Sequence, residues 1–138
     1  MVCTAPNVAH VRLFVADETW SELTSGVDPV VRVSARDLQQ AQRARTRLRH
    51  DDGDVAVILD VQVAVAPDVR SAFASLAAAD GVRYAGTVQG LAGLIADIET
   101  AGVADGVTLV DASGADPDLA ELGRTVLDLL SQRHRAVA

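Results

Sequence analysis

The most informative stretch of this sequence is Tyr84–Val110, which reads YAGTVQGLAGLIADIETAGVADGVTLV. Thr87 is a residue type that favours the position before a helix, and apolar residues at helical spacing follow it as far as about Thr100. Gly102 is a residue that commonly ends a helix, and the segment 107–110 has the composition of a short buried strand. The stretch therefore predicts a helix followed by a strand, as in a βαβ unit.

Outward from this stretch, strand-like and helical segments alternate along the chain. Strands are predicted at 11–16, 29–34, 55–66 and 107–110, and helices at 18–25, from 37 to about 50, from 67 to about 76, at 88–100, and after the cap Asp116 and Pro117. This alternation is typical of parallel strands joined by right-handed helical crossovers. The length of 138 residues suits one domain, so we expect a single α/β domain over residues 1–138.

The segment 55–66 gives the strongest strand signal. Its positions are mostly apolar on both faces, which is typical of a parallel strand covered on two sides. Asp60 and Gln62 interrupt one of these faces. A buried Asp60 with a raised pKa is a catalytic candidate. However, the strand is longer than the usual length of about five or six residues, and such a strand can leave Asp60 or Gln62 wet or at a subunit contact. We favour the second interpretation.

The composition excludes several classes of function. The formal net charge of -7 and the scarcity of aromatic residues argue against a nucleic-acid surface. No apolar run reaches the roughly 18 residues of a membrane span, and the first residues lack the pattern of a signal peptide. Cys3 is the single cysteine, which excludes an internal disulfide and fits a reducing compartment. We therefore expect a cytoplasmic protein without nucleic-acid or membrane partners.

No self-contained catalytic group stands out in the sequence. The three histidines have no metal-ligand spacing, so no metal site is expected and the catalytic residues stay unassigned. Arg43, Arg45, Arg47 and Arg49 alternate along one predicted helix and are interpreted as a solvated face. The acidic turn 51–54 lacks the ligand pattern of a calcium loop.

Two motifs in the stretch Tyr84–Val110 resemble one enzyme family. Gly86-Thr87 and the segment 101–106 (AGVADG) resemble the C-terminal part of luciferase-like flavin- and F420-dependent monooxygenases, with Val88 and Gln89 in place of the family's proline and glutamate. The resemblance implies a (β/α)8 barrel and an oxidoreductase that uses FMN or F420. A whole barrel needs about 250 residues. We therefore expect half of a barrel with about four strands, and the alternative is a small open doubly wound sheet.

Gly86 and Thr87 are the candidate cofactor-binding residues. A helix N-terminus presents free backbone N–H groups and the positive end of the helix dipole, which together attract phosphate. The resemblance implies that these residues hold a phosphate of FMN or F420. The ordinary interpretation is a helix cap after a flexible turn, and it is favoured by about four to one because such caps are common.

The expected half-barrel leaves two open sheet edges, and unpaired edges invite association. A homodimer is the favoured outcome, and a separate N-terminal barrel half is the alternative partner. Two functions follow from this expectation. The chain is either a truncated luciferase-like oxidoreductase subunit that still binds FMN or F420, or a non-catalytic scaffold that dimerises through its sheet edges.

Overall fold

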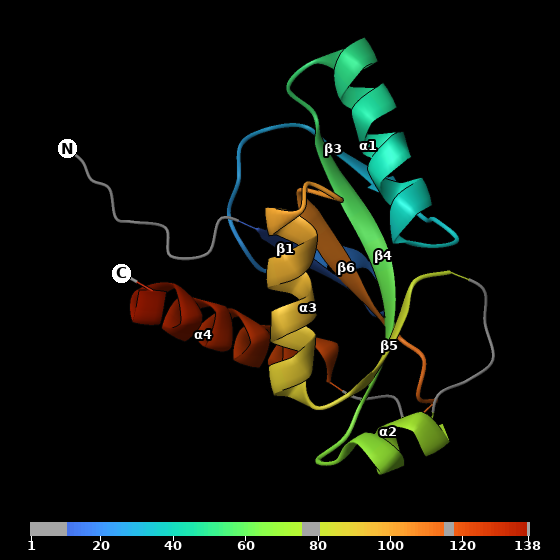
Figure 1. Cartoon of the computed structure of the whole chain (residues 1–138), viewed down its shortest axis with the longest axis vertical. Coiled ribbons are helices and arrows are strands. Elements are labelled where there is room, and N and C mark those ends of the chain that lie inside the picture. Colours follow the sequence, from blue (N-terminus) through green and yellow to red (C-terminus); the bar gives the residue numbers. More distant parts are fainter. Residues whose placement is uncertain (1–10, 76–80, 115–117, 138) are drawn as a thin grey trace.

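Figure 1 shows the computed structural model, which describes residues 11–75, 81–114 and 118–137. The elements along the chain are β1 (Arg12–Ala16), β2 (Trp20–Glu22), β3 (Val30–Val33), α1 (Leu38–Asp52), β4 (Ala56–Val65), α2 (Val69–Ser75), β5 (Arg83–Gly86), α3 (Val88–Thr100), β6 (Gly106–Asp111) and α4 (Leu119–Val137).

The strands form one open, curled sheet in the order β2-β1-β6-β4-β3, with β5 also paired to β4 (Figure 1). Every pairing is parallel except the antiparallel pair of β1 and β2. The long strand β4 holds β6 along one edge. Along its other edge it holds β3 beside residues 56–59 and β5 beside residues 62–65. The predicted α/β fold with parallel strands is therefore confirmed.

Helices α3 and α4 cover one face of this sheet. They pack against each other, and α4 also packs on β1 and β6 while α3 packs on β5 and β6 (Figure 1). Leu13, Leu59 and Leu109 face these helices from three neighbouring strands, and Leu91 and Ile95 face back from α3. All five side chains are fully buried. Burial of a large aliphatic side chain is worth about 1.5–3 kcal/mol, so this cluster is the main core.

A second apolar cluster lies on the opposite face, over the first half of β4, and no described helical residue belongs to it. Phe14, Ala56 and Ile58 are buried there, and Trp20 and Val30 pack against them. We call this surface the helix-free face. Both faces of β4 are covered as expected, but the cover on this side consists of side chains from β1, β2 and β3.

The prediction of a helix at 18–25 is wrong. Residues 20–22 form β2, in which Trp20 lies opposite Ala16 and Glu22 lies opposite Phe14. Asp17 ends β1 with a turn, because its carboxylate accepts a hydrogen bond from the Thr19 N–H at 3.2 Å. The side chains of Trp20 and Glu22 are two residues apart in the strand, so both lie on the helix-free face. Burial of the Trp20 indole there outweighs the weak helical pattern of the sequence. As a result, β1 is an interior strand rather than a sheet edge.

The predicted helix starts depend on caps, and two of them are confirmed. The Asp37 carboxylate accepts a hydrogen bond from the Gln40 N–H at 2.8 Å and starts α1. Thr87 caps α3, which ends at Thr100 as predicted. The strand β5 just before it was not predicted, because four residues carry little strand signal.

The predicted start of the last helix, Asp116 and Pro117, lies outside the described residues. The Asp118 carboxylate accepts a hydrogen bond from the Glu121 N–H at 3.1 Å, at the start of α4. None of the helices in the described residues is long and apolar enough to cross a membrane.

Asp105 fastens α1 to the sheet. Its carboxylate accepts hydrogen bonds from Arg45 at 2.9 Å and from the Val57 N–H at 2.9 Å, and Arg49 lies 3.6 Å away. Arg45 also donates to the Gly102 carbonyl at 3.3 Å. The interpretation of this arginine series as a solvated face is therefore wrong for Arg45 and Arg49, which lie one helical turn apart and share a single acceptor.

Candidate functional site

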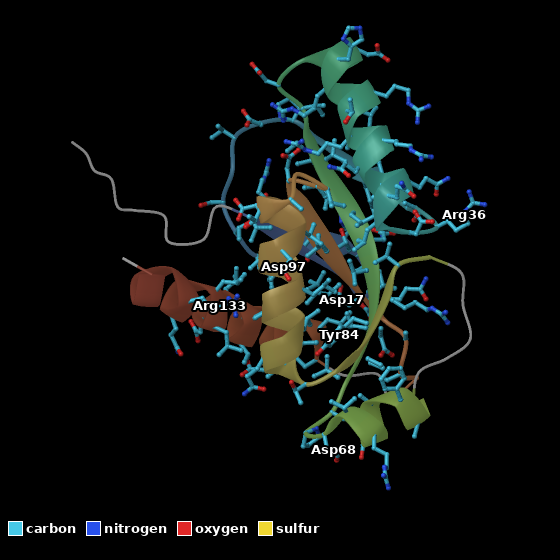
Figure 2. All side chains as sticks on the ribbon, in the orientation of Figure 1. Asp17, Arg36, Asp68, Tyr84, Asp97 and Arg133 are labelled. Atoms are coloured by element: carbon cyan, nitrogen blue, oxygen red, sulfur yellow. The ribbon has the colours of Figure 1, made fainter. Side chains whose placement is uncertain are left out.

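The start of α3 places the predicted residue Thr87 at the carboxyl ends of the parallel strands. The Thr87 hydroxyl accepts a hydrogen bond from the Gly90 N–H at 3.2 Å, as expected for a helix cap. The Tyr84 hydroxyl donates to the Thr87 carbonyl oxygen at 2.8 Å. Figure 2 shows Tyr84 beside the first turn of α3. Hydrogen bonds thus hold both the hydroxyl and the carbonyl group of Thr87.

Gly86 and Gly90 make room for the Tyr84 ring. A Cβ atom added at either position would collide with the Tyr84 hydroxyl. The Gly86 carbonyl accepts a hydrogen bond from the Ala66 N–H at 3.1 Å, and Gly86 itself is buried at the end of β5. Packing around Tyr84 therefore accounts for both glycines without a ligand.

A cavity of about 600 Å³ opens beside this cap, between the starts of α3 and α4. Its apolar wall includes Val65, Val88 and Leu122, and Thr87 lies on its rim, whereas Gly86 does not line it. The other charged or polar lining residues include the carboxylates of Asp118 and Glu121, and no arginine among the described residues lines the cavity. Two carboxylates without a cation disfavour an anionic group, so these residues fit a cofactor phosphate poorly.

The helix-free face has an aromatic pair at its centre. The rings of Phe14 and Trp20 stack with their centroids 4.6 Å apart and their planes 15° apart. The Trp20 indole N–H donates to the Thr108 hydroxyl at 2.9 Å, and Thr108 is fully buried beneath it. Trp20 therefore lies across the sheet from β2 to β6 and covers the strand between them.

Two ion pairs flank the aromatic pair. Arg12 binds both carboxylate oxygens of Glu22, at 2.8 and 2.7 Å. This bond to Arg12 lowers the pKa of Glu22 below its ordinary value. On the other side Arg32 binds Asp60 at 2.8 Å, and the Ser34 hydroxyl lies 3.2 Å from the second Asp60 oxygen. The two guanidinium groups also lie over the rings, Arg12 over Phe14 and Arg32 over the indole.

The pairing of Asp60 removes the chemistry that a lone buried carboxylate would offer. Its side chain is 19% exposed and its charge is balanced by Arg32. Within the described residues, every buried polar side-chain atom has a hydrogen-bond partner. In the same residues, no three His, Cys, Asp or Glu side chains are grouped to hold a metal ion. The helix-free face therefore combines apolar side chains with paired charges.

Sequence reasoning singled out Asp60 but missed its partners. Arg32 lies on the adjacent strand β3, which is in register with the part of β4 that leads to Asp60, and Ser34 directly follows the end of β3. Trp20 was assigned to a helix, although its alternation with Glu22 is the signal that indicates a strand. The structure does not bring Asp60 and Thr87 together into one site, because Asp60 lies midway along β4, whereas Thr87 lies beyond the carboxyl end of β5 at the start of α3.

The sequence matches no protein-family model and no curated protein.

Proposed function

We propose that this chain is a non-catalytic interaction module that forms a homodimer through its helix-free face and the adjoining sheet edge. The observation that carries the proposal is the second apolar cluster, in which Trp20 and Val30 stay partly exposed beside the buried Phe14 and Ile58, and no described helix belongs to the cluster. Apolar clusters at a protein surface commonly mark sites of association. The charges around the cluster favour the same conclusion.

Burying this face costs little because its charges are already paired. Arg12 with Glu22 and Arg32 with Asp60 form two neutral pairs. An unpaired charge would add a desolvation penalty of several kcal/mol, whereas a paired and hydrogen-bonded charge avoids most of it. The outer edge of β3 adjoins the face and has no described strand beside it. A second copy would cover both the face and the edge, because a stable interface buries roughly 800 Å² per partner.

The finer fold, half of a (β/α)8 barrel, is part of this proposal, and the order of β3, β4 and β6 supports it. In such a barrel, parallel strands that follow one another in sequence are neighbours. Here β3, β4 and β6 are neighbours in that order, although β5 pairs with β4 on the side of β3. The pairing of β1 with β6 favours the alternative, a small open doubly wound sheet, because the first strand of a C-terminal half-barrel would lie beside β3 and the outer edge of β1 is paired with β2. A separate N-terminal barrel half would attach at the outer edge of β3, which has no described strand beside it.

Light scattering combined with tryptophan fluorescence tests the homodimer. We expect a dimer at micromolar concentration, and on dilution the emission of Trp20, the only tryptophan, shifts to longer wavelength as the face becomes exposed. Val30→Asp places a charge at the edge of the apolar cluster and is expected to yield a monomer. Val27→Asp is the matched control, because Val27 is 98% exposed outside the face. A stable wild-type monomer at micromolar concentration contradicts the proposal.

A second candidate function is binding of FMN or F420 by Gly86 and Thr87, as part of a truncated luciferase-like oxidoreductase. The supporting observation is the cavity of about 600 Å³ beside Thr87. Cavities at the carboxyl ends of parallel strands are the usual ligand sites of α/β folds. FMN or F420, when bound, would supply the hydride chemistry. The opposing observation is the pair of carboxylates on the cavity wall.

Fluorescence titration with FMN and with F420 tests this candidate. If the cofactor phosphate lies at Thr87, then Asp118→Asn together with Glu121→Gln removes like-charge repulsion and should tighten binding by about tenfold. Glu18→Gln, in an exposed turn, is the control and should leave the affinity unchanged. Absence of saturable quenching up to several hundred micromolar, in the wild type and in the double variant, rules out this function for the isolated chain.

A further inference from the structure

We propose that the outer edge of β5 and the groove beside it bind an extended acidic peptide segment by strand addition. The inference does not depend on the homodimer, because it concerns a different part of the molecule. It is carried by three features of the described residues: backbone groups without a strand partner, flanking apolar side chains and two arginines without an ion-pair partner.

The backbone of β5 has a free edge. The Val82 and Gly86 carbonyls accept hydrogen bonds from β4 and its end, from the Gln62 N–H at 2.9 Å and the Ala66 N–H at 3.1 Å. Backbone groups of successive strand residues point alternately to opposite sides. The N–H and C=O groups of Arg83 and Ala85 therefore point away from β4, and no described residue pairs with them. Such an edge accepts an added strand.

A groove of about 510 Å³ runs beside this edge and is bordered by the start of α1 and by α2. Leu38 and Phe73 line it and are 36% and 62% exposed, which is unusual for side chains this large. In an added strand, alternate side chains would lie on the same side as these two residues. The groove thus favours a segment in which every second residue is apolar.

The charge of the groove selects an acidic segment. Arg36 and Arg83 line it, and neither guanidinium has an ion-pair partner among the described residues. Figure 2 shows Arg36 pointing away from the body of the molecule. The Asp37 carboxylate is engaged in the cap of α1. The net charge of -7 opposes an acidic ligand only weakly, because interactions beyond about 8 Å are screened at physiological salt.

The same charges disfavour a second copy at this edge. In a symmetric pair of β5 strands, the arginines at position 83 of both copies would approach each other, and like charges in contact are unfavourable. A foreign acidic segment meets no such repulsion. It would contribute carboxylates to Arg36 and Arg83 and backbone groups to the free edge.

Fluorescence anisotropy with a labelled eight-residue peptide of alternating glutamate and valine tests the proposal, with a lysine–valine peptide as the charge-reversed probe. We expect binding of the acidic peptide only, weakened by about tenfold by Arg83→Glu. Arg43→Glu makes the same charge change on the outer side of α1 and should have no effect.

The variant Ala85→Pro tests strand addition in particular. It removes one outward N–H while the hydrogen bonds to β4 are kept, because those come from the neighbouring residues. We expect about a tenfold loss of affinity with an unchanged circular dichroism spectrum. Equal binding of both peptides, or an unchanged affinity in folded Ala85→Pro, overturns the proposal. So does a dimer that dissociates when Arg83 is replaced by glutamate, since the edge would then belong to a second copy.

Discussion

Tyr84 restricts the residue type at the end of β5 and in the first turn of α3. Its ring occupies the space that side chains at positions 86 and 90 would need, and its hydroxyl holds the Thr87 carbonyl at 2.8 Å. A sequence motif that resembles a phosphate-binding turn is therefore also explained by an aromatic ring and two glycines.

This explanation predicts an unusual response to Gly90→Ala. Glycine to alanine inside a helix normally stabilises by about 1 kcal/mol. Here the new methyl group displaces the Tyr84 hydroxyl from Thr87, and we expect a loss of about 1 kcal/mol in the free energy of unfolding. In a Tyr84→Phe background the hydroxyl is absent and the nearest ring carbon lies 3.3 Å from the added Cβ, so the same substitution should destabilise much less. Urea denaturation of the four proteins measures the cycle, and additive effects would contradict the steric conflict.

At the scale of elements, α1 depends on polar contacts more than on a buried stripe. Ala41 is its fully buried residue, while Leu38 is partly exposed. Asp105, just before β6, holds α1 through Arg45 and Arg49 and also binds the Val57 N–H on β4. One carboxylate therefore joins a helix and two strands.

The substitution Asp105→Asn tests this junction. It keeps the size of the side chain but leaves two arginines without a counter-charge, and we expect a loss of about 1–3 kcal/mol in the free energy of unfolding. Asp97→Asn is the matched control, because Asp97 is exposed on α3, as Figure 2 shows, and its side chain has no partner among the described residues. Its effect should stay within about 0.5 kcal/mol. Equal effects of the two substitutions in urea denaturation would show that Asp105 does not hold the junction.

Elements were predictable where several local signals coincided. The helix α3 has a capping threonine, an apolar stripe and a glycine after its end, so both boundaries followed from the sequence. The strand β2 has three residues and depends on the contact of Trp20 with Phe14 and Thr108, which lies 88 residues further along the chain. Local patterns carry no information on such distant partners.

At the scale of the whole molecule, the sequence predicted the class of the fold and left the strand order undetermined. Alternating strands and helices imply a parallel sheet, but the pairing of β1 with β6 depends on packing across the whole chain. In the candidate site, too, the local features were predictable from the sequence and the non-local ones were not. The helix cap at Thr87 was predictable because it is local, whereas the helix-free face joins residues from β1, β2, β3, β4 and β6.

The pairing of β1 with β6 also governs the order in which the fold is assembled. Arg12 is in register with Gly106, whereas β3 and β4 are joined through a single helix, α1. During synthesis on the ribosome, β3, α1 and β4 can associate while β6 has yet to emerge. The closure of so long a loop is entropically costly and slow. The edge of β1 that pairs with β6 thus stays open until most of the sequence has been translated, while β2 covers only the opposite edge.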